Sequence, residues 1–297
     1  WETFIERGEA IAKHACDPTF NGEVHFGYLF GVMVEKGSEF PVGDARRYYK
    51  YRVVFQGNNV RDQNWDVALF NEMASTPATM EASRIADIYS CFEGCTMEGR
   101  DVEQAYLQAE MEGPPVYITL PRELWTEEMH KMRNPVVRLE KALYGHKHSG
   151  VFWQKFCQEQ VLKAGFVPIS ENWPCVFFNY QSNMLLIVYV DDMKLAGPAH
   201  SMEETWRALG RNIKLEVPKG DKTSRDQSSD STLTFLGCEI TRCQRTIRGK
   251  TVQGCVYNVE DSLKKALDKY AEAVRSITGL DPEWYDAPTP FLDETTK

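Results

Sequence analysis

Long apolar runs are missing from this sequence of 297 residues. The longest uninterrupted run, from Met184 to Val190, is far shorter than the roughly 18 residues that a membrane-spanning helix requires, which excludes that class of protein. The chain also lacks internal repeats, an initiator Met and a basic segment followed by an apolar one. We therefore expect neither a repeat fold nor a signal peptide, and the chain reads as a segment of a longer polypeptide.

Patterns that bind zinc or form disulfides are also scarce. The eight cysteines are scattered, several of them within apolar stretches, and only six histidines are present. Neither close pair, Cys91 with Cys95 or Cys238 with Cys243, has a histidine or a second pair at zinc-ligand spacing. We expect reduced, mostly buried thiols and no structural zinc site.

An overall positive charge, which many nucleic-acid-binding proteins carry, is absent: the formal net charge is −9. The charges are nevertheless separated into blocks. Residues 44–61 carry five Arg or Lys against one acid, residues 129–166 carry seven against two, and residues 62–128 carry fourteen acids against three Arg. Two basic segments around an acidic one could form a groove for a polyanion beside a metal-binding cluster. On charge alone, solvated surfaces without a ligand are the simpler interpretation.

Hydrophobic periodicity predicts a mixed α+β fold. Helices are expected near residues 4–12, 150–165, 202–215 and 261–277, and over 73–92 with Ser75 or Thr76 as N-cap and Pro77 in the first turn. Strands are expected as a pair within 27–37, as a half-exposed strand over 46–57, as a strand that ends at Asp101 before a short helix, and as a hairpin within 232–259. Residues 113–121 and 219–231 are predicted to be loops, the second of them disordered.

Two adjacent aspartates, Asp191 and Asp192, follow the apolar run at 184–190 and precede a second one that Gly197 ends. This pattern predicts a hairpin with both acids at its tip. Neighbouring carboxylates beside a core strand repel each other unless a cation compensates them, and hard oxygen ligands favour Mg²⁺. Asp101, at the end of another predicted strand, could supply a third carboxylate for two-metal phosphoryl or nucleotidyl transfer. An exposed turn without metal is about equally compatible with the two aspartates alone.

Five segments resemble the reverse transcriptases of copia-type LTR retrotransposons, in the order and rough spacing of that family. They are "KYRVVFQG" at 50–57, "RDVEQAYLQAEM" at 100–111, "LEKALYGHKHSGVFWQKF" at 139–156, "YVDD" at 189–192 and "FLGCEI" at 235–240. The resemblance covers about residues 32–290. It implies an RNA-directed DNA polymerase domain of a Pol polyprotein, in the cytoplasm or within element particles, with RNase H, protease and integrase outside this segment.

The resemblance implies a right-hand polymerase fold, with a palm of antiparallel sheet plus helices, fingers and a partial thumb. Residues 1–42 would form an N-terminal extension and the start of the fingers. Residues 43–257 would form fingers, at about 43–93 and 113–150, and palm for the rest. Residues 258–297 would form a thumb-like helix and a connector tail. The partners implied are a primer on an RNA or DNA template and a deoxynucleoside triphosphate.

The same resemblance assigns roles to individual residues. Asp101, Asp191 and Asp192 would be the catalytic triad and, with the backbone carbonyl of Val102, would bind two Mg²⁺ ions, or Mn²⁺. Tyr106 would lie under the sugar and exclude a 2′-hydroxyl, so that the product is DNA; ordinary core packing is the alternative for this side chain. The further residues implied at the nucleotide site are Lys50, Arg52, Val102, Tyr144 and Lys147, and those implied to support the primer end are Phe235, Leu236 and Gly237.

The chain departs from the family pattern between residues 146 and 152. His146, His148, Gly150, Val151 and Phe152 stand where Leu, Gln, Pro, Arg and Ala are usual, whereas Tyr144, Gly145, Lys147 and Trp153 are kept. A catalytically silent, domesticated domain that binds nucleic acid or protein is therefore the alternative to the enzyme. A metal-dependent phosphohydrolase is less compatible, because no histidine is close in sequence to Asp101 or Asp191.

Overall fold

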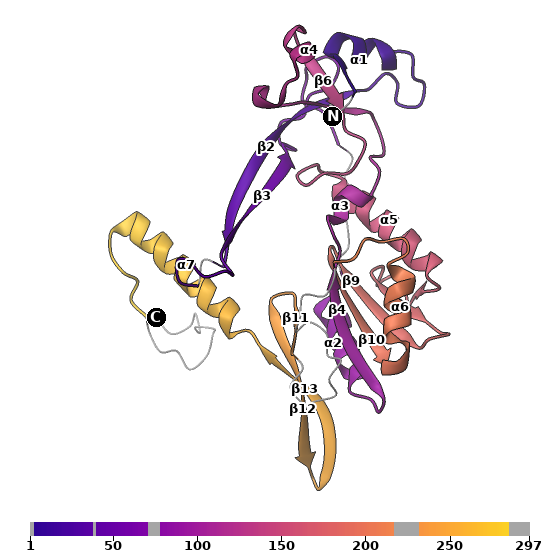
Figure 1. The fold of residues 1–297 in the computed structure, drawn as a ribbon, viewed down its shortest axis with the longest axis vertical. Helices are drawn as coiled ribbons and strands as arrows, with labels where there is room; N and C mark the ends of the chain where they lie inside the picture. Colours follow the sequence, from indigo (N-terminus) through magenta and orange to yellow (C-terminus); the bar gives the residue numbers. More distant parts are fainter. Residues whose placement is uncertain (1–2, 38–39, 71–77, 217–231, 285–297) are drawn as a thin grey trace, which may run out of the picture. The chain divides into compact units, whose positions relative to one another are not determined.

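The computed structural model describes residues 3–37, 40–70, 78–216 and 232–284. The chain divides into two compact units, residues 1–220 and residues 221–297. Within the described ranges, no helix is long and apolar enough to cross a bilayer. The mixture of helices and antiparallel strands in these units confirms the predicted α+β class (Figure 1).

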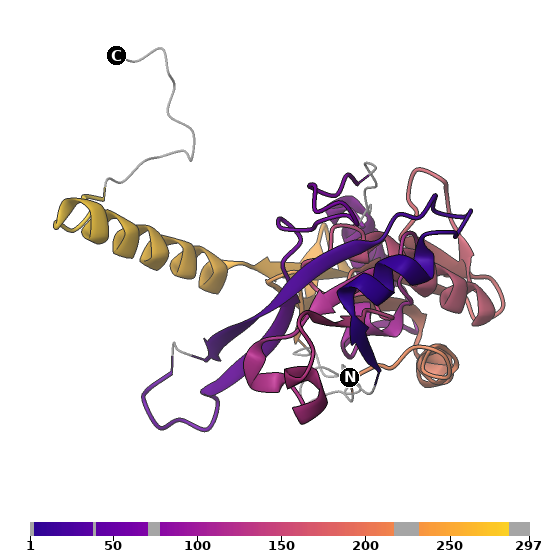
Figure 2. The ribbon, with the colours of Figure 1, turned by 90° about the horizontal axis from the view of Figure 1, so that it is seen from above.

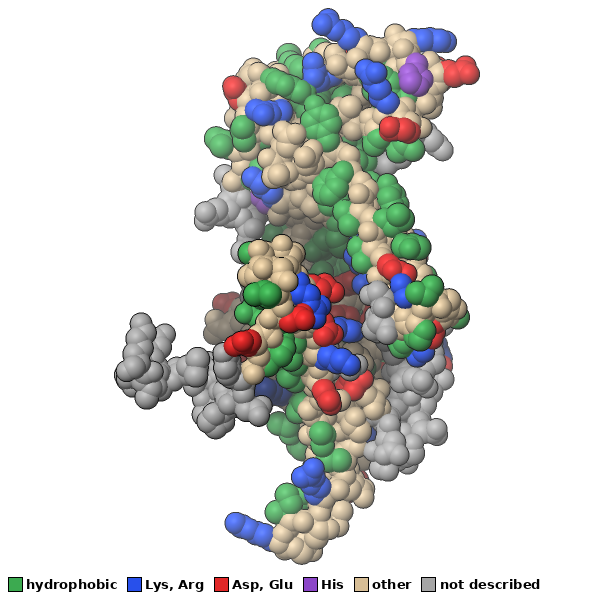
Figure 3. Space-filling model, turned by 90° about the vertical axis from the view of Figure 1, so that its left-hand side faces the viewer, with side chains coloured by type: hydrophobic (Ala, Val, Ile, Leu, Met, Phe, Trp, Pro, Cys, Tyr) green, Lys and Arg blue, Asp and Glu red, His purple; other side chains and the backbone are tan. Residues whose placement is uncertain are grey.

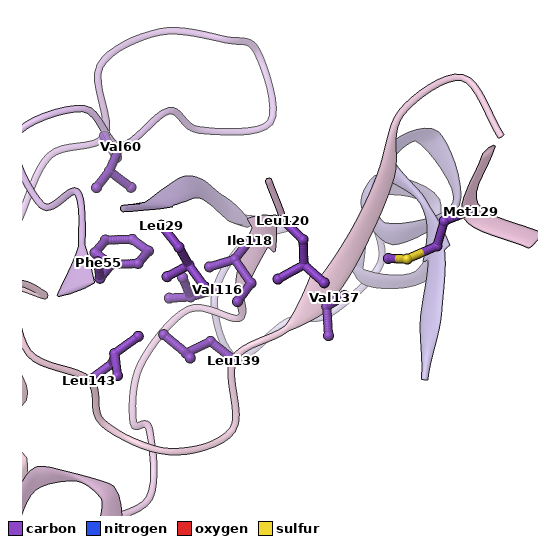
Figure 4. Packing of buried hydrophobic residues seen from close by; sticks show 11 residues of the cluster. Leu29, Phe55, Val60, Val116, Ile118, Leu120, Met129, Val137, Leu139 and Leu143 are labelled. Carbon is purple, nitrogen blue, oxygen red and sulfur yellow. The ribbon is translucent and has the colours of Figure 1, made fainter. Parts of the chain in front are cut away.

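The first sheet of the larger unit has the strand order β1-β6-β5-β2-β3. Its strands are β1 (Phe4–Glu6), β2 (His25–Lys36), β3 (Tyr48–Phe55), β5 (Val116–Thr119) and β6 (Pro135–Arg138), with β2 and β5 parallel and the other pairs antiparallel. Helices α1 (Arg7–His14) and α4 (Glu127–His130) and the 3₁₀ turn η1 (Arg122–Leu124) accompany this sheet. Its core is a cluster in which Leu29, Phe55 and Ile118 face one another (Figure 4).

Beyond this core, β2 and β3 continue side by side as a two-stranded ribbon (Figures 1 and 2). Residues 48–53 of β3 are all exposed, so the prediction of a half-exposed strand is wrong for most of its length. The physical reason is that no other element covers this part of the ribbon among the described residues, and only Phe55 at its base enters the core. Exposed hydrophobic and basic side chains are both visible on the face drawn in Figure 3.

The predicted strand pair within 27–37 is also wrong, because β2 is one continuous strand. Gly27 and Gly31, both within this strand, have a packing role. A Cβ atom at Gly27 would collide with the Phe55 ring, and one at Gly31 with the Tyr51 ring, both from the neighbouring strand. These glycines make room for aromatic rings across the ribbon instead of ending a strand.

The second sheet is antiparallel throughout, with the order β4-β10-β9-β8-β7. Its strands are β4 (Cys95–Asp101), β7 (Val167–Pro168), β8 (Val176–Asn179), β9 (Met184–Tyr189) and β10 (Asp192–Pro198). The helices of this region are α2 (Met80–Ser90), α3 (Ala105–Gln108), α5 (Ser149–Lys163) and α6 (Met202–Leu209), and the 3₁₀ turn η2 (Ala199–Ser201) precedes α6.

Helices α2 and α6 cover opposite faces of the second sheet. Lys194 of β10 contacts α2 at Ser83, whereas Arg100 of β4, paired with Met193, stacks on Trp206 of α6 at 4.8 Å. Residues 193 and 194 are neighbours in one strand, and successive side chains of a strand point to opposite faces. Both faces of the strands that end at the aspartates are therefore packed.

Two glycines join the base of the ribbon to the segment before α5. A Cβ atom at Gly57 would overlap the Gly145 carbonyl, and one at Gly145, where φ is +93°, would overlap the Phe55 carbonyl. The Phe55 N–H donates to the Tyr144 carbonyl at 2.7 Å across the same contact. Only glycine allows two backbones to approach this closely, so the contact depends on both residues.

Several element boundaries differ from the predictions. Helix α2 begins at Met80 with Thr79 as N-cap, while the predicted caps Ser75 and Thr76 and the predicted first-turn Pro77 lie outside the described residues. Strand β5 occupies the middle of the predicted loop 113–121, because the prolines that suggested a loop stand just outside it. Helix α6 ends at Leu209, earlier than expected, although Ile213 is still buried.

The eight cysteines differ in their exposure. Cys157, Cys175 and Cys238 are buried, but Cys16 is exposed and the others are partly exposed, so the expectation of mostly buried thiols is only partly met.

The smaller unit contains a three-stranded antiparallel sheet and one helix. The strands are β11 (Thr232–Phe235), β12 (Cys238–Ile247) and β13 (Lys250–Asn258), followed by α7 (Glu260–Thr278). Both turns have two residues with positive φ, Leu236 with Gly237 and Arg248 with Gly249, which is the geometry of tight hairpins. The predicted hairpin and helix are confirmed, with a third strand added. The predicted disordered loop, 219–231, lies outside the described residues.

Candidate active site

The two adjacent aspartates lie where β9 turns into β10. Tyr189 pairs with Asp192 across the hairpin, and Val190 and Asp191 form the turn. Val190 has a φ of +54°, a conformation that is rare for a β-branched residue. The indole N–H of Trp153, on α5, donates to the Val190 carbonyl at 2.7 Å, so this carbonyl of the turn has a hydrogen-bond partner. The predicted hairpin with acids at its tip is confirmed.

Asp101 lies directly beside this hairpin. It ends β4 and is the register partner of Asp192 on β10. The Val102 N–H donates to the Asp191 carbonyl at 2.7 Å, and the Glu216 N–H donates to the Asp101 carbonyl at 2.8 Å. Backbone pairing thus brings all three aspartates to one end of the second sheet, although Asp101 and Asp191 are 90 positions apart in sequence.

The environment of the three carboxylates differs from that of the core behind them. Asp191 is exposed, and Asp101 and Asp192 are half-buried, whereas Met193 and Val102 next to them are buried. In the part of the chain that the structure describes, no group of three or more His, Cys, Asp or Glu side chains is arranged as a ready metal site. The donor set at this sheet end is nevertheless made of hard oxygen atoms, the type that Mg²⁺ prefers.

Two tyrosines adjoin the aspartates. The rings of Tyr106, on α3, and Tyr144 lie 4.5 Å apart between centroids. Burial, and then the negative charge of Asp191, raise the pKa of both phenols above the usual value of 10.0, while the Arg52 charge opposes this rise for Tyr144. The structure therefore brings Tyr106, Tyr144, Asp191 and Arg52 within electrostatic reach of one another. Both phenols stay protonated at neutral pH and can donate hydrogen bonds.

Tyr106 has a packing role as well. It contacts the buried cluster of Ala109, Ala142 and Phe152, so the predicted sugar-contacting residue is also part of the hydrophobic core at its edge.

The predicted cationic residues occupy different surroundings. Lys50 and Arg52 are exposed on β3, where they pair with Val34 and Val32, so their side chains leave the ribbon on the same face. Lys147 lies over the ring of Phe70 at 4.8 Å, and its charge lowers the pKa of His146 as a minor cause after burial and two neighbouring histidines. The Arg52 charge thus acts on Tyr144, whereas Lys147 contacts Phe70.

The residues predicted to support the primer belong to the smaller unit. Phe235 is buried and pairs with Cys238, and Leu236 and Gly237 form the tight turn between β11 and β12. The Ser262 hydroxyl donates to the Gly237 carbonyl at 2.7 Å, which ties this turn to the start of α7. Their role toward a primer remains a prediction.

Sequence reasoning missed a buried ion pair behind the aspartates. Lys194, two residues after Asp192, is fully buried and contacts the carboxylate of Asp87 and, at 3.0 Å, the hydroxyl of Ser83, both on α2. The signal was present in the sequence: a lysine inside the apolar run 193–197 requires a buried anion, since an unpaired charge is very costly there.

Comparison with known proteins agrees with this geometry. The family model described as "Reverse transcriptase (RNA-dependent DNA polymerase)" matches residues 42–243. The Ty1-DR1 Gag-Pol polyprotein of the transposon from Saccharomyces cerevisiae is 34% identical over 204 residues, which cover 61% of this chain and 11% of that polyprotein. The truncated Ty1-A Gag-Pol polyprotein from the same yeast is 26% identical over 204 residues, covering 61% of this chain and 16% of the relative.

This chain therefore spans less than a fifth of the length of these curated relatives. The match of the reverse transcriptase model covers more than half of the chain, and the similarity to Ty1 Gag-Pol polyproteins agrees with the resemblance read from the five segments. The chain belongs to the reverse transcriptase (RNA-dependent DNA polymerase) family, as a domain of a copia-type retrotransposon Pol polyprotein.

Proposed function

We propose that this chain is an active RNA-directed DNA polymerase, which transfers nucleotides from deoxynucleoside triphosphates to a primer 3′-hydroxyl on an RNA or DNA template. The observation that carries the proposal is the register of Asp101 opposite Asp192, with the Val102 N–H bonded to the Asp191 carbonyl. Three carboxylates at one sheet end repel one another, which favours a use that involves cations.

The larger unit would supply most of a right-hand polymerase. The second sheet with its helices is the candidate palm, and the first sheet with the β2–β3 ribbon is the candidate fingers. Strands β3, β5 and β6 lie within the expected fingers at about 43–93 and 113–150, whereas α2, at 80–90, packs against β10 and would belong to the palm. Helix α7, within 258–297, is the candidate start of the thumb, and residues 1–42 would extend the fingers. The RNase H and integrase parts of a Pol polyprotein would act from outside this segment.

Asp101, Asp191, Asp192 and the Val102 carbonyl would hold two Mg²⁺ ions, or Mn²⁺. Such ions, when bound, lower the pKa of an attacking hydroxyl and stabilise the leaving pyrophosphate. The chain's own contribution is positioning. The β4–β10 pairing and the Trp153 contact to the hairpin turn fix where the carboxylates are held, so little reorganisation is needed when the substrate arrives.

The nucleotide would lie between the ribbon and the tyrosine pair. Arg52 and Lys50 leave one face of β3 and could hold the triphosphate, with Lys147 as a further cation of the same segment as Tyr144. Tyr106, half-buried and packed against Tyr144, would fill the space that a ribose 2′-hydroxyl requires. Discrimination against ribonucleotides would then follow from steric exclusion in a well-packed site.

The decisive experiment is primer extension on RNA and DNA templates, with Mg²⁺ and with Mn²⁺, by the wild-type chain and by Asp101→Asn and Asp191→Asn. Each variant should lose at least ~10³-fold in deoxynucleotide incorporation, a barrier increase of about 4 kcal/mol. Folding should be retained, and melting temperatures should be unchanged or higher because one repulsive charge is removed. Asp268→Asn, on the exposed face of α7, is the matched control and should keep full activity.

Extension by either variant at a rate near that of the wild type would contradict the proposed chemistry. A wild-type chain that binds primer–template without extending it under any of these conditions would support the silent domain instead, consistent with the altered segment 146–152.

A further inference from the structure

The long hairpin of the smaller unit continues beyond the end of its own sheet. Strand β11 pairs with β12 only as far as Thr241, so residues 242–247 of β12 and 250–255 of β13 pair only with each other among the described residues. These residues and the turn between them, 242–255, form the β12–β13 arm (Figure 1). Every residue from Gln244 to Gln253 is exposed. The outer part of the arm is therefore a two-stranded ribbon that no other described element covers.

The arm is strongly basic in a chain that is acidic overall. The twenty residues between Glu239 and Glu260 contain no Asp or Glu, and they contain four cations. These are Arg242, Arg245, Arg248 and Lys250. In the part of the chain that the structure describes, none of the four forms an ion pair. A local net charge of +4 without counter-ions, against a net charge of −9 for the whole chain, favours a polyanionic partner.

The strand register gathers three of these cations at the outer end of the arm. Arg245 pairs with Val252. Lys250 pairs with Ile247, so it lies on the same face as Arg245 and is its diagonal neighbour across the two strands. Arg248, with a φ of +50°, is in the turn at the tip. Long cationic side chains that are grouped in this way can contact neighbouring phosphates of a nucleic-acid strand.

The opposite face carries uncharged hydrogen-bonding groups near the tip. The cross-strand pairs on this face are Gln244 with Gln253 and Thr246 with Thr251. Amide and hydroxyl groups donate to phosphate and sugar oxygens in protein–nucleic acid contacts. The outer part of the arm, 244–253, exposes only two large hydrophobic side chains, Ile247 and Val252. This composition favours a nucleic acid over an apolar protein surface as the partner of the arm.

We propose that the β12–β13 arm binds the phosphate backbone of a nucleic-acid duplex through Arg245, Arg248 and Lys250. The shape of the arm suits a duplex, because a two-stranded β-ribbon fits the major groove of B-form DNA, and the minor groove of an A-form duplex is wide and shallow. This role rests on the proposed function only for the nature of the partner, since a polymerase must hold a primer–template duplex. It adds a contact outside residues 235–237, which the family resemblance implies at the primer end.

The test measures the affinity of the full chain for a blunt-ended DNA duplex by fluorescence anisotropy over a range of salt concentrations. Metal ions and nucleotides are left out, so that binding is measured without catalysis. The arm variant combines Arg245→Gln, Arg248→Gln and Lys250→Gln. Each phosphate contact contributes about 0.9 to the slope of log affinity against log salt concentration, so this slope should be less steep by about 2–3 for the arm variant. The loss of affinity should be the same for duplexes of different sequence, because phosphate contacts carry no sequence information.

Two further variants make the result specific. The matched control removes the same charge elsewhere, by Lys13→Gln, Arg84→Gln and Arg207→Gln at exposed positions of α1, α2 and α6, and should keep a slope near that of the wild type. Arg245→Lys with Arg248→Lys keeps all the charges of the arm and should also keep the wild-type slope. All of these side chains are exposed, so each variant should melt as the wild type does.

A wild-type slope in the folded arm variant, or no duplex binding by the wild-type chain, would overturn the proposal. An equal change of slope in the matched control would overturn it as well, because the effect would then come from net charge and not from the arm. An equally large loss for a single strand of the same length would overturn the assignment to a duplex. Primer extension is measured separately: an inactive chain can still bind through the arm, and an active chain can lack this contact, so the two failures are distinguishable.

Discussion

Replacing one partner of the buried Lys194–Asp87 pair should destabilise the larger unit far more than replacing both. Both side chains are almost completely buried, and the pair connects β10, which begins at Asp192, to α2. Lys194→Met removes the ammonium and leaves the Asp87 carboxylate without its cation in the core. Asp87→Leu does the reverse and leaves the lysine without its anion. The double variant replaces the pair by two apolar side chains.

The magnitudes follow from the cost of burying charge. Breaking a buried pair by removing one partner costs about 3–5 kcal/mol, whereas replacing the whole pair by apolar residues is often neutral or stabilising by about 1–4 kcal/mol. Each single variant should therefore lower the melting temperature by roughly 6–20 °C, at about 2–4 °C per kcal/mol for a unit of this size. The double variant should melt near the wild type. Ser83→Ala, which removes one hydroxyl acceptor from the lysine, should cost about 1.5–3 kcal/mol.

The assay is equilibrium urea unfolding of the four chains of this double-mutant cycle, followed by tryptophan fluorescence. Trp206 and Trp153 are both buried in the larger unit and report on it. The matched control is a second cycle at Arg207 and Glu203, an exposed pair on α6 that should couple by only about 0.3–0.5 kcal/mol.

Two results would refute this reasoning. Single variants that each cost less than about 1 kcal/mol would mean that water reaches the pair, contrary to the complete burial of Lys194. Additive single costs in the double variant would mean that the two charges do not depend on each other. Either result would also mean that the pair does not link α2 to β10.

Four further predictions concern the site and its surroundings. Tyr106→Val should raise ribonucleotide incorporation and largely keep deoxynucleotide incorporation, because the proposed role of the ring is to exclude the 2′-hydroxyl by about 1–3 kcal/mol of overpacking. Unchanged discrimination between the two kinds of nucleotide in competition assays would contradict the proposed position of the ring beside the sugar. Trp153→Phe should cost about 0.5–1.5 kcal/mol of stability and slow incorporation, because the Val190 carbonyl loses its donor. Primer–template affinity, measured by fluorescence anisotropy, should fall steeply with salt despite the net charge of −9. Because the pKa of His146 is lowered to about 4 on folding, the unfolded chain binds its proton first, so stability should fall by up to about 3 kcal/mol between pH 6.5 and 4, and His146→Phe should flatten this part of the profile.

The sequence was most informative where local signals and topology agree. The hairpin at 184–198 could be predicted because a continuous apolar strand, two acids and Gly197 follow one another directly. The proximity of Asp101 to the two adjacent aspartates came from the family resemblance, because no local sequence pattern shows which strand pairs with β10. Strand pairing is decided by contacts between distant segments, and a single sequence records those only indirectly.

The wrong or missing predictions have a common physical origin. They concern residues whose role depends on tertiary contacts with distant parts of the chain. The segment 27–37 was predicted as a strand pair, but it is one strand in which Gly27 and Gly31 accommodate rings from β3. The ion pair of Lys194 was missed, because its partner comes from a helix more than a hundred residues earlier in the chain. His146 looked like a loss of substrate contacts, whereas in the structure its ring is buried and borders a cavity. In each case the partner that explains the residue is remote in sequence.

The backbone contact of Gly57 with Gly145 couples the position of the ribbon to that of the tyrosine pair. No side chain separates the two backbones, and the Phe55 N–H is bonded directly to the Tyr144 carbonyl. If the ribbon that carries Lys50 and Arg52 tilts, changes of side-chain rotamer cannot take up the movement at this backbone contact. The backbone of Tyr144 must therefore move with the ribbon. If Lys50 and Arg52 hold a triphosphate as proposed, a movement of the ribbon on binding would reach Tyr144, whose ring packs against that of Tyr106.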